Sequence, residues 1–144
     1  MLIRILIVAA ILVVATLAAL WWRRRQGVVR EVERAGALSS KTLGAKRGYH
    51  ATFVQFSTPM CAKCPPTATL LGRIAAEDPR VVHIEIDASE RLELARELDV
   101  MRTPTVLVLD GDGVVVARMN GAPTEHQARE ALATVPRTGT DYTI

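Results

Sequence analysis

The stretch Met60-Cys61-Ala62-Lys63-Cys64 determines how the rest of this chain is interpreted. Its two cysteines, the only ones in the chain, lie three positions apart between a β-prone apolar run and a segment with helical spacing. At such a strand-to-helix junction, the free N–H groups and positive dipole of the helix start lower a thiol pKa. The neighbouring Lys63 cation acts in the same direction and favours a reactive thiolate. The spacing also lets the second thiol reach the first and close a small disulfide ring.

Two other interpretations of the cysteine pair are weaker. A zinc site usually needs four ligands, and His50, His83 and His126 share no ligand spacing. Inert structural cysteines are more often dispersed through a core. Redox chemistry at Cys61 and Cys64, with no metal and no cofactor beyond their disulfide, is therefore the favoured interpretation, and the other two stay open.

The segments around this junction alternate between strand and helix. Apolar, β-prone runs predict strands at 51–56, 81–86, 105–109 and 114–117. Helical spacing predicts helices at 67–77, at 90–98 with Ser89 as its cap, and at 124–134 with a Thr124–Gln127 capping box. This order indicates an α/β protein whose sheet is covered by helices on both faces.

A second signal lies 40 residues after Cys64, where Pro104 stands at the entry to a buried strand. Proline has no N–H, so it is tolerated at a first strand position and not in the middle of a sheet. The position suits a cis Thr103–Pro104 bond. An ordinary trans proline that starts the strand is the alternative.

Taken together, these features resemble the thioredoxin family over roughly residues 49–136. The shared features, in order and spacing, are 53–56, Cys61–Cys64, Arg102-Thr103-Pro104-Thr105, a Gly-Asp-Gly hairpin and Asn120-Gly121-Ala122. The resemblance implies a thioredoxin-like fold with a central mixed sheet and a cis Pro104 packed beside the cysteines. It also implies that the Thr103 backbone pairs with an incoming polypeptide and that Gly121 allows close approach. Met60, Thr103, Pro104 and Gly121 are therefore expected to bind substrate.

The chain departs from the family's usual residues close to the cysteines. Met60 replaces the usual tryptophan, and Ala62-Lys63 replaces the usual Gly-Pro. Gln55 stands where thioredoxins carry a buried carboxylate, and His83 where a lysine is common. Pro65-Pro66 occupies the first helical turn and could shift the helix start. We expect Lys63 and Gln55 to tune the pair, with Gln55 able to donate hydrogen bonds but unable to act as a base.

The N-terminal segment predicts a transmembrane anchor with a basic flank at 1–25. Residues 5–22 form an uncharged run of 18 residues, about 27 Å long as a helix and enough to cross a hydrocarbon core. Trp21-Trp22 suits the headgroup layer, and the basic residues that follow place the C-terminal side in the cytoplasm, N-out and C-in. A cleaved signal peptide is the alternative, with 15–18 as a weak cleavage site.

Length and composition suit one domain with appendages, because the chain has 144 residues and 49% of them are hydrophobic. We predict a linker at 26–48, a thioredoxin-like domain at 49–136 and a flexible tail at 137–144. Within the linker, Val28, Val29 and Val32 could form an amphipathic surface helix or a solvated extension. Residues 38–47 could add a first helix to the domain.

Charge is divided unevenly along the chain. Residues 1–48 hold nine Lys or Arg against two Glu, a net +7, whereas residues 49–144 hold nine against thirteen Asp or Glu, a net −4. The folded part is therefore acidic and poor in aromatic residues, which disfavours nucleic-acid binding.

These observations predict a single-pass, membrane-tethered thiol–disulfide oxidoreductase that acts on protein thiols and disulfides from the cytoplasmic side. Cys61 would attack a client disulfide and Cys64 would resolve the mixed disulfide. A thioredoxin-reductase-like system is the expected reductant. If the topology is reversed, an extracytoplasmic reductase of the cytochrome c maturation type is the leading alternative. A non-catalytic thioredoxin-fold module that binds a membrane partner is the other.

Overall fold

The structure, a computed structural model, describes residues 2–25, 29–31 and 36–136, with side chains described for 3–21 and 36–136. Its elements in chain order are α1 (Leu2–Arg25), β1 (Val29–Glu31), α2 (Ser40–Leu43), β2 (Ala51–Ser57), α3 (Cys64–Ala76), β3 (Val81–Asp87), α4 (Leu92–Glu97), β4 (Thr105–Asp110), β5 (Val115–Asn120) and α5 (Glu125–Ala133). The predicted order of strands and helices from β2 to α5 is confirmed, and so is the α/β class.

One mixed sheet organises the domain, in the order β1-β5-β4-β2-β3. Strands β2 and β3 are parallel and are joined by the α3 crossover, whereas β4 and β5 run antiparallel to their neighbours. Strand β2 lies inside the sheet, and all seven of its residues are buried. This burial explains why its sequence is almost continuously apolar rather than alternating.

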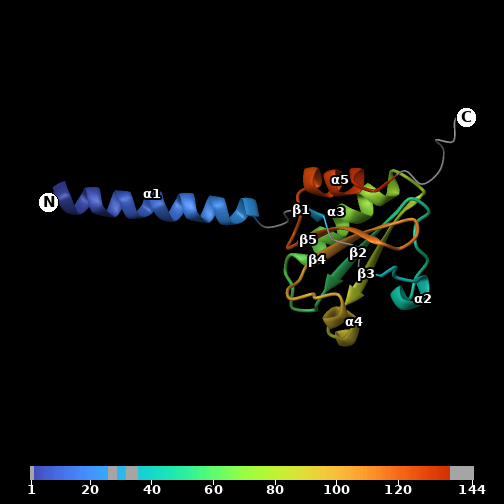
Figure 1. Cartoon of the computed structure of the whole chain (residues 1–144). Coiled ribbons are helices and arrows are strands. Elements are labelled where there is room, and N and C mark those ends of the chain that lie inside the picture. Colours follow the sequence, from blue (N-terminus) through green and yellow to red (C-terminus); the bar gives the residue numbers. More distant parts are fainter. Residues whose placement is uncertain (1, 26–28, 32–35, 137–144) are drawn as a thin grey trace, which may run out of the picture.

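Helices cover the sheet on both sides (Figure 1). On the side that we call the α3 face, α3 and α5 pack over a core that includes Phe53, Leu71 and Met119. On the opposite side, the α4 face, α4 and α2 pack over a core that includes Phe56 and Leu107. Because side chains alternate along a strand, neighbouring residues of β2 contribute to different faces.

Two predicted helix starts are corrected. Helix α4 begins at Leu92 with Arg91 as its N-cap, because the Ser89 N–H and hydroxyl both bind the Asp87 carboxylate in a turn before the helix. Helix α3 begins at Cys64, three residues before the predicted start. Its two prolines fall in the first turn, where a missing N–H has no intrahelical partner to lose.

The predicted start of the last helix is confirmed. The Thr124 hydroxyl accepts from the Gln127 N–H at 3.2 Å, and the Gln127 side chain accepts from the Thr124 N–H at 2.9 Å. This reciprocal pair forms the expected capping box and fixes the first turn of α5.

Part of the predicted linker contributes to the domain. Leu38 and Leu43 are buried in the core of the α4 face, and Leu43 lies in the short helix α2, which Ser39 caps. Residues 29–31 form β1, an edge strand paired with β5, in place of the surface helix or solvated extension that the sequence left open. Val28, Val32 and the predicted tail at 137–144 lie outside the described residues.

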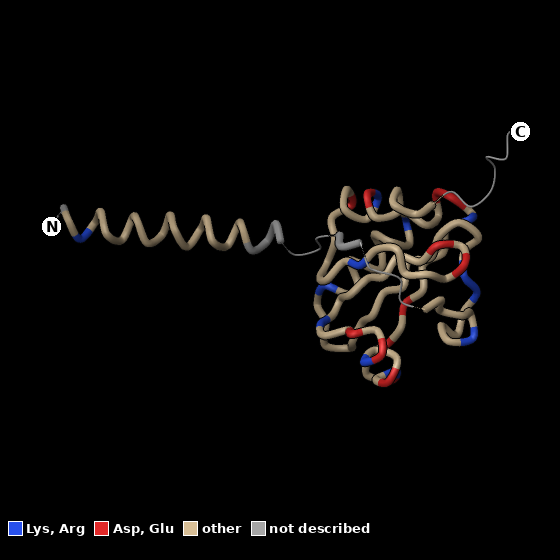
Figure 2. Tube along the Cα trace, in the orientation of Figure 1, with Lys and Arg blue, Asp and Glu red and all other residues tan. Residues whose placement is uncertain are grey.

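Helix α1 extends away from the domain in Figure 1, and Arg4 is the one charged residue along its described side chains (Figure 2). Its segment from Ile3 to Trp21 has a mean hydropathy of 2.8 and is long and apolar enough to cross a membrane. By length and composition alone, α1 is a candidate membrane span, a property that an N-terminal signal sequence shares.

Candidate redox site

Cys61 and Cys64 are joined by a disulfide, with their Cα atoms 5.4 Å apart. Two consecutive turns bring them together, since the Cys61 N–H donates to the Thr58 carbonyl at 3.1 Å and the Cys64 N–H donates to the Cys61 carbonyl at 3.2 Å. Cys61 is partly exposed, whereas Cys64 is only 2% exposed. A large molecule approaching the site therefore meets the Cys61 sulfur.

The disulfide is located at the start of α3. Cys64 is the first helical residue and Lys63 is the N-cap, which makes no side-chain capping hydrogen bond. The positive end of the helix dipole therefore points toward the sulfur pair and favours negative charge there once the disulfide is reduced. The Lys63 side chain is exposed beside it.

The loop before β4 closes one side of the site. The Thr103–Pro104 bond is cis, as predicted. The Thr103 hydroxyl lies 3.2 Å from the hydroxyl of Thr58, in the turn that holds Cys61. Gly121, with φ +100°, donates its N–H to the Pro104 carbonyl at 2.7 Å. Thr103 is therefore linked to the turn that holds Cys61, and Gly121 is linked to the neighbouring Pro104. Met60, 94% exposed, adjoins Cys61 in sequence.

Beneath Cys64, a polar cluster of Gln55, Ser57, His83 and Glu85 lies on the α3 face. The Gln55 Nε2 donates to the Cys64 carbonyl at 3.0 Å and to the Ser57 Oγ at 2.9 Å. The Ser57 hydroxyl donates to Glu85 Oε1 at 2.6 Å. Gln55 is fully buried, so these bonds satisfy an amide that would otherwise be costly to bury.

His83 completes the cluster on the far side of Gln55, with its Nε2 3.2 Å from the Gln55 Oε1. Burial lowers the pKa of His83, and the Glu85 carboxylate opposes this shift more weakly. The ring also lies close to α3 at Gly72, where a Cβ would be 3.9 Å from Nδ1. The imidazole therefore resists protonation in the folded protein.

Sequence reasoning had identified Gln55 and His83 but missed Ser57 and Glu85. Gln55 is paired with Glu85 across the parallel strands β2 and β3. Residues two apart on one strand share a face, so Ser57 follows Gln55. The alternation was readable in the sequence, but the pairing register that brings Glu85 to Gln55 was not.

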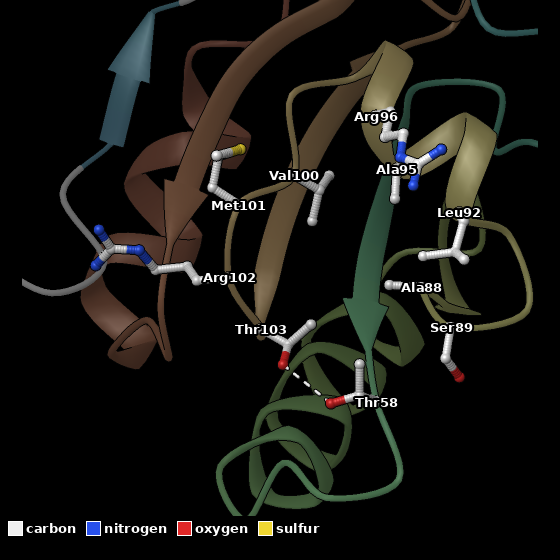
Figure 3. Close-up of a pocket in the computed structure, with 10 residues that line it drawn as sticks. All are labelled: Thr58, Ala88, Ser89, Leu92, Ala95, Arg96, Val100, Met101, Arg102 and Thr103. Carbon is white, nitrogen blue, oxygen red and sulfur yellow. Dashed lines mark hydrogen bonds between the residues drawn. The ribbon is translucent and has the colours of Figure 1, made fainter.

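A pocket of about 410 Å³ adjoins the site between the end of β2, α4 and the loop before Pro104. Figure 3 shows Thr58 and Thr103 at one end of it, joined by their hydrogen bond, with Ala88, Leu92 and Val100 along it. The pocket offers apolar surface next to the Cys61 turn. Within the described ranges, no group of three or more His, Cys, Asp or Glu side chains is arranged to hold a metal ion.

Comparison with known proteins agrees with this geometry. The family model for the thioredoxin-like domain matches residues 40–136. The chain belongs to the thioredoxin-like family. Its site is that of a thiol–disulfide oxidoreductase, with the disulfide-forming pair Cys61–Cys64.

Individual relatives support the assignment. The chain is 35% identical over 78 residues to a thioredoxin from Methanocaldococcus jannaschii, covering 54% of this chain and 86% of that protein. It is 28% identical over 108 residues to the putative thioredoxin H10 of Arabidopsis thaliana, covering 75% and 70%. The solved structure of Fasciola hepatica thioredoxin superimposes with a TM-score of 0.54 at 25% identity, covering 62% and 84%.

Proposed function

We propose that this protein is a membrane-tethered thiol–disulfide oxidoreductase that uses its Cys-Ala-Lys-Cys pair to exchange disulfides with protein clients. The observation that carries the proposal is the unequal exposure of the two bonded cysteines, with Cys61 partly exposed and Cys64 buried. The cis Thr103–Pro104 bond supports it. This arrangement provides one sulfur for the client and one for the internal step.

In the reducing direction, the Cys61 thiolate attacks a client disulfide. A bond forms between the Cys61 sulfur and one client sulfur, and the second client sulfur leaves as a thiolate. Cys64, as a thiolate, then attacks the Cys61 sulfur and releases the first client sulfur. The protein ends as the Cys61–Cys64 disulfide, and two electrons have passed from the protein to the client. An external dithiol or a thioredoxin-reductase-like system must restore the thiols.

The loop at Thr103 suits the binding of an extended client segment. Among the described residues, Thr103 makes no backbone–backbone hydrogen bond, so its N–H and C=O can pair with a client backbone in the manner of an added strand. Gly121, whose N–H donates to the Pro104 carbonyl, presents no side chain next to this loop. Exposed Met60 and the apolar pocket along Leu92 and Val100 offer contacts for client side chains.

We assign α1 the role of a single-pass anchor, with the domain on the cytoplasmic side. The uncharged run 5–22 has one basic residue before it, Arg4, whereas Arg23-Arg24-Arg25 follows it directly. This asymmetry favours N-out, C-in orientation. Cytoplasmic pools keep such dithiols reduced, so this location favours the reductase direction.

Insulin reduction by dithiothreitol tests the catalytic proposal. The full chain in detergent should accelerate the reaction, and Cys61→Ser should abolish the acceleration. In a separate reaction without dithiothreitol, the pre-reduced Cys64→Ser variant should accumulate a covalent adduct with the client. Thr69→Ser, a conservative change on the exposed side of α3, is the control and should keep wild-type activity. A wild-type chain that does not accelerate the reaction would support the non-catalytic binding module instead.

Topology is tested separately by reporter fusions at the C-terminus. A reporter active only in the cytoplasm should be functional, and one active only outside the membrane should be silent. The opposite pattern would reject the cytoplasmic assignment and leave the extracytoplasmic reductase. A fusion product lacking the N-terminal segment would identify α1 as a cleaved signal.

A further inference from the structure

The hydrogen bonds of the polar cluster run in one direction. The Gln55 Oε1 can only accept, so its 3.2 Å partner, the His83 Nε2, carries the hydrogen. The Gln55 Nε2 donates onward to the Cys64 carbonyl and the Ser57 Oγ. The carboxylate of Glu85 can only accept, so Ser57 donates its hydroxyl hydrogen to it. The sequence of donors therefore ends at Glu85.

Glu85 also lies close to the group that holds Cys64. The same Gln55 Nε2 that donates to the Cys64 carbonyl at 3.0 Å is 3.4 Å from Glu85 Oε1. One amide thus separates the carboxylate from the backbone of the buried cysteine. Glu85 itself is exposed, so it can exchange protons with bulk water.

Cys64 needs such a partner because its side chain is almost completely shielded. At 2% exposure, the thiol cannot release its proton directly to bulk solvent when it becomes the nucleophile. The other neighbours are unsuited to accept that proton. Gln55 has no basic group, and the exposed Lys63 is a cation. His83 already donates its Nε2 hydrogen to Gln55, and its Nδ1 faces α3 near Gly72.

We propose that Glu85 is the proton acceptor of the resolving step, reached from Cys64 by way of the Ser57 hydroxyl. The inference rests on the function proposed above, because it concerns the second half of that exchange. The buried carboxylate usual in the resembled family is absent at Gln55, and the carboxylate is supplied from the neighbouring strand.

The step balances as follows in the reducing direction. The Cys64 thiol loses its proton, the Ser57 hydroxyl passes a proton to the Glu85 carboxylate and regains one from the thiol side. The Cys64 thiolate then forms a bond with the Cys61 sulfur while the bond from Cys61 to the client breaks. The client leaves as a thiolate, and Glu85 returns its proton to water.

Other charged or titratable groups lie on β3 and on the helix packed against it, and they must be controlled in any pH profile. They are His83 and Asp87 on β3, and Lys63 and Cys64 at the start of α3, the helix packed on β3. Strand β2 contributes only the neutral Gln55 and Ser57. His83→Gln removes the one imidazole of the cluster and provides the background profile.

The test follows the reduced full chain as it reacts with 5,5′-dithiobis(2-nitrobenzoate), whose thiolate product absorbs visible light. The first released thiolate reports attack by Cys61, and the second reports resolution by Cys64. In Glu85→Gln, we expect the second phase near pH 7 to slow by on the order of 10²-fold, the lower end of general-base contributions, with the first phase unchanged. Ser57→Ala should slow the same phase.

The measured pKa of the Cys64 thiol is the second readout. It shows whether Glu85 acts as a proton acceptor, only as a nearby charge, or only in packing. Removing the negative charge of Glu85 should lower the measured pKa of the Cys64 thiol and, by charge alone, speed resolution. Slower resolution together with a lower thiol pKa supports the proposal. Glu85→Asp should restore part of the rate, and Glu97→Gln, the same change on α4, should leave both phases at wild-type rates.

The failure of each proposal is distinguishable. A second phase in Glu85→Gln within twofold of wild type from pH 5 to 9 overturns the role of Glu85 and leaves the proposed function standing. A wild-type chain that releases no first thiolate, or whose Cys61→Ser variant still shows the first phase, overturns the proposed function itself. Circular dichroism of each variant at the assay temperature verifies that the fold is intact.

Discussion

The two faces of the sheet use the same strand differently. On the α4 face, β2 contributes Val54 and Phe56, which are fully buried in an apolar core. On the α3 face, the same strand contributes Phe53 to an apolar core but then Gln55 and Ser57, which turn polar where the strand approaches the cysteines. This difference shows that burial alone does not distinguish the residues of β2 that pack the core from those that support the cysteines. Their hydrogen-bond partners distinguish them.

The α3 face can bury polar residues near the cysteines because both the oxygen and the nitrogen of the Gln55 amide have hydrogen-bond partners. Gln55 accepts from His83 and donates to Ser57 and Cys64. A buried carboxylate at the same position would face the Cys64 carbonyl, which can only accept, without the amide donor. Glutamine therefore suits its neighbours, and Gln55→Asp alone would remove the donor to the Cys64 carbonyl.

The largest expected effect tests whether the two faces are equal as packing surfaces. Phe53→Ala and Phe56→Ala remove the same side chain from positions that are both 0% exposed on opposite faces. Each should lower the free energy of unfolding by about 3–5 kcal/mol, as measured by urea titration followed by circular dichroism. Tyr49→Ala, at a residue 90% exposed, is the control and should change it little. A marked inequality between the two phenylalanine variants would show that one face dominates stability.

A smaller effect is expected from exchanging the polarity of neighbouring residues. Gln55→Leu leaves the Cys64 carbonyl, the Ser57 hydroxyl and His83 without the amide partner and should cost about 1–3 kcal/mol. Val54→Thr places a hydroxyl in the apolar α4 face and should cost a similar amount. Urea titrations of both variants measure these changes. If the Gln55→Leu chain is more stable than wild type, the polar cluster lowers the stability of the fold. Its role would then lie in its effect on the cysteines.

Much of this contrast could be predicted from the sequence, and the reasons for the rest are physical. The apolar run of β2, the cysteine pair and Pro104 are local signals, and each was read correctly for fold and placement. The Ser57–Glu85 contact depends on the register between β2 and β3, which tertiary packing fixes. Ser89 looked like a helix cap, but Asp87 two residues earlier competed for its hydrogen bonds.

The start of the folded domain was hard to predict from the sequence for a similar reason. Leu38 and Leu43 stand among polar residues and glycines, so no periodicity marks them as core. Their burial comes from docking against the α4 face, where the Leu38 N–H donates to the Gly113 carbonyl at 2.8 Å. Contacts between segments this far apart in sequence leave no local pattern.

The next prediction concerns α5, which covers the α3 face without entering the chemistry. Thr124→Ala removes the side chain that caps the Gln127 N–H and should lower the free energy of unfolding by about 1 kcal/mol. The rate of disulfide exchange should stay at the wild-type value. Thr69→Ala is the matched control, because the Thr69 hydroxyl donates to the Pro65 carbonyl on the exposed side of α3 and caps no helix end. A rate change in Thr124→Ala would link α5 to the site.

The smallest effect concerns the pH dependence of the α3 face, and it follows from His83. The folded protein holds the pKa of His83 below its usual value because burial disfavours the imidazolium. As the pH falls below about 6.5, the ordinary value, the unfolded chain therefore binds a proton first. The free energy of unfolding should decrease through that window, and the decrease should end below the folded-state pKa. Above the window, His83 is neutral in both states and adds no pH dependence.

His83→Gln isolates this contribution, since its amide can still donate to Gln55 while carrying no titratable group. Urea titrations at pH 7.5 and 5.0 should show a smaller loss of stability on acidification in His83→Gln than in wild type. His126→Gln, at an exposed histidine on α5 with an imidazole 3.9 Å from Glu130, should keep the wild-type loss. Equal losses in wild type and His83→Gln would mean that the imidazole is protonated as readily in the folded protein as in the unfolded chain. The polar end of the α3 face would then be open to water, and the distinction between the two faces would be one of composition alone.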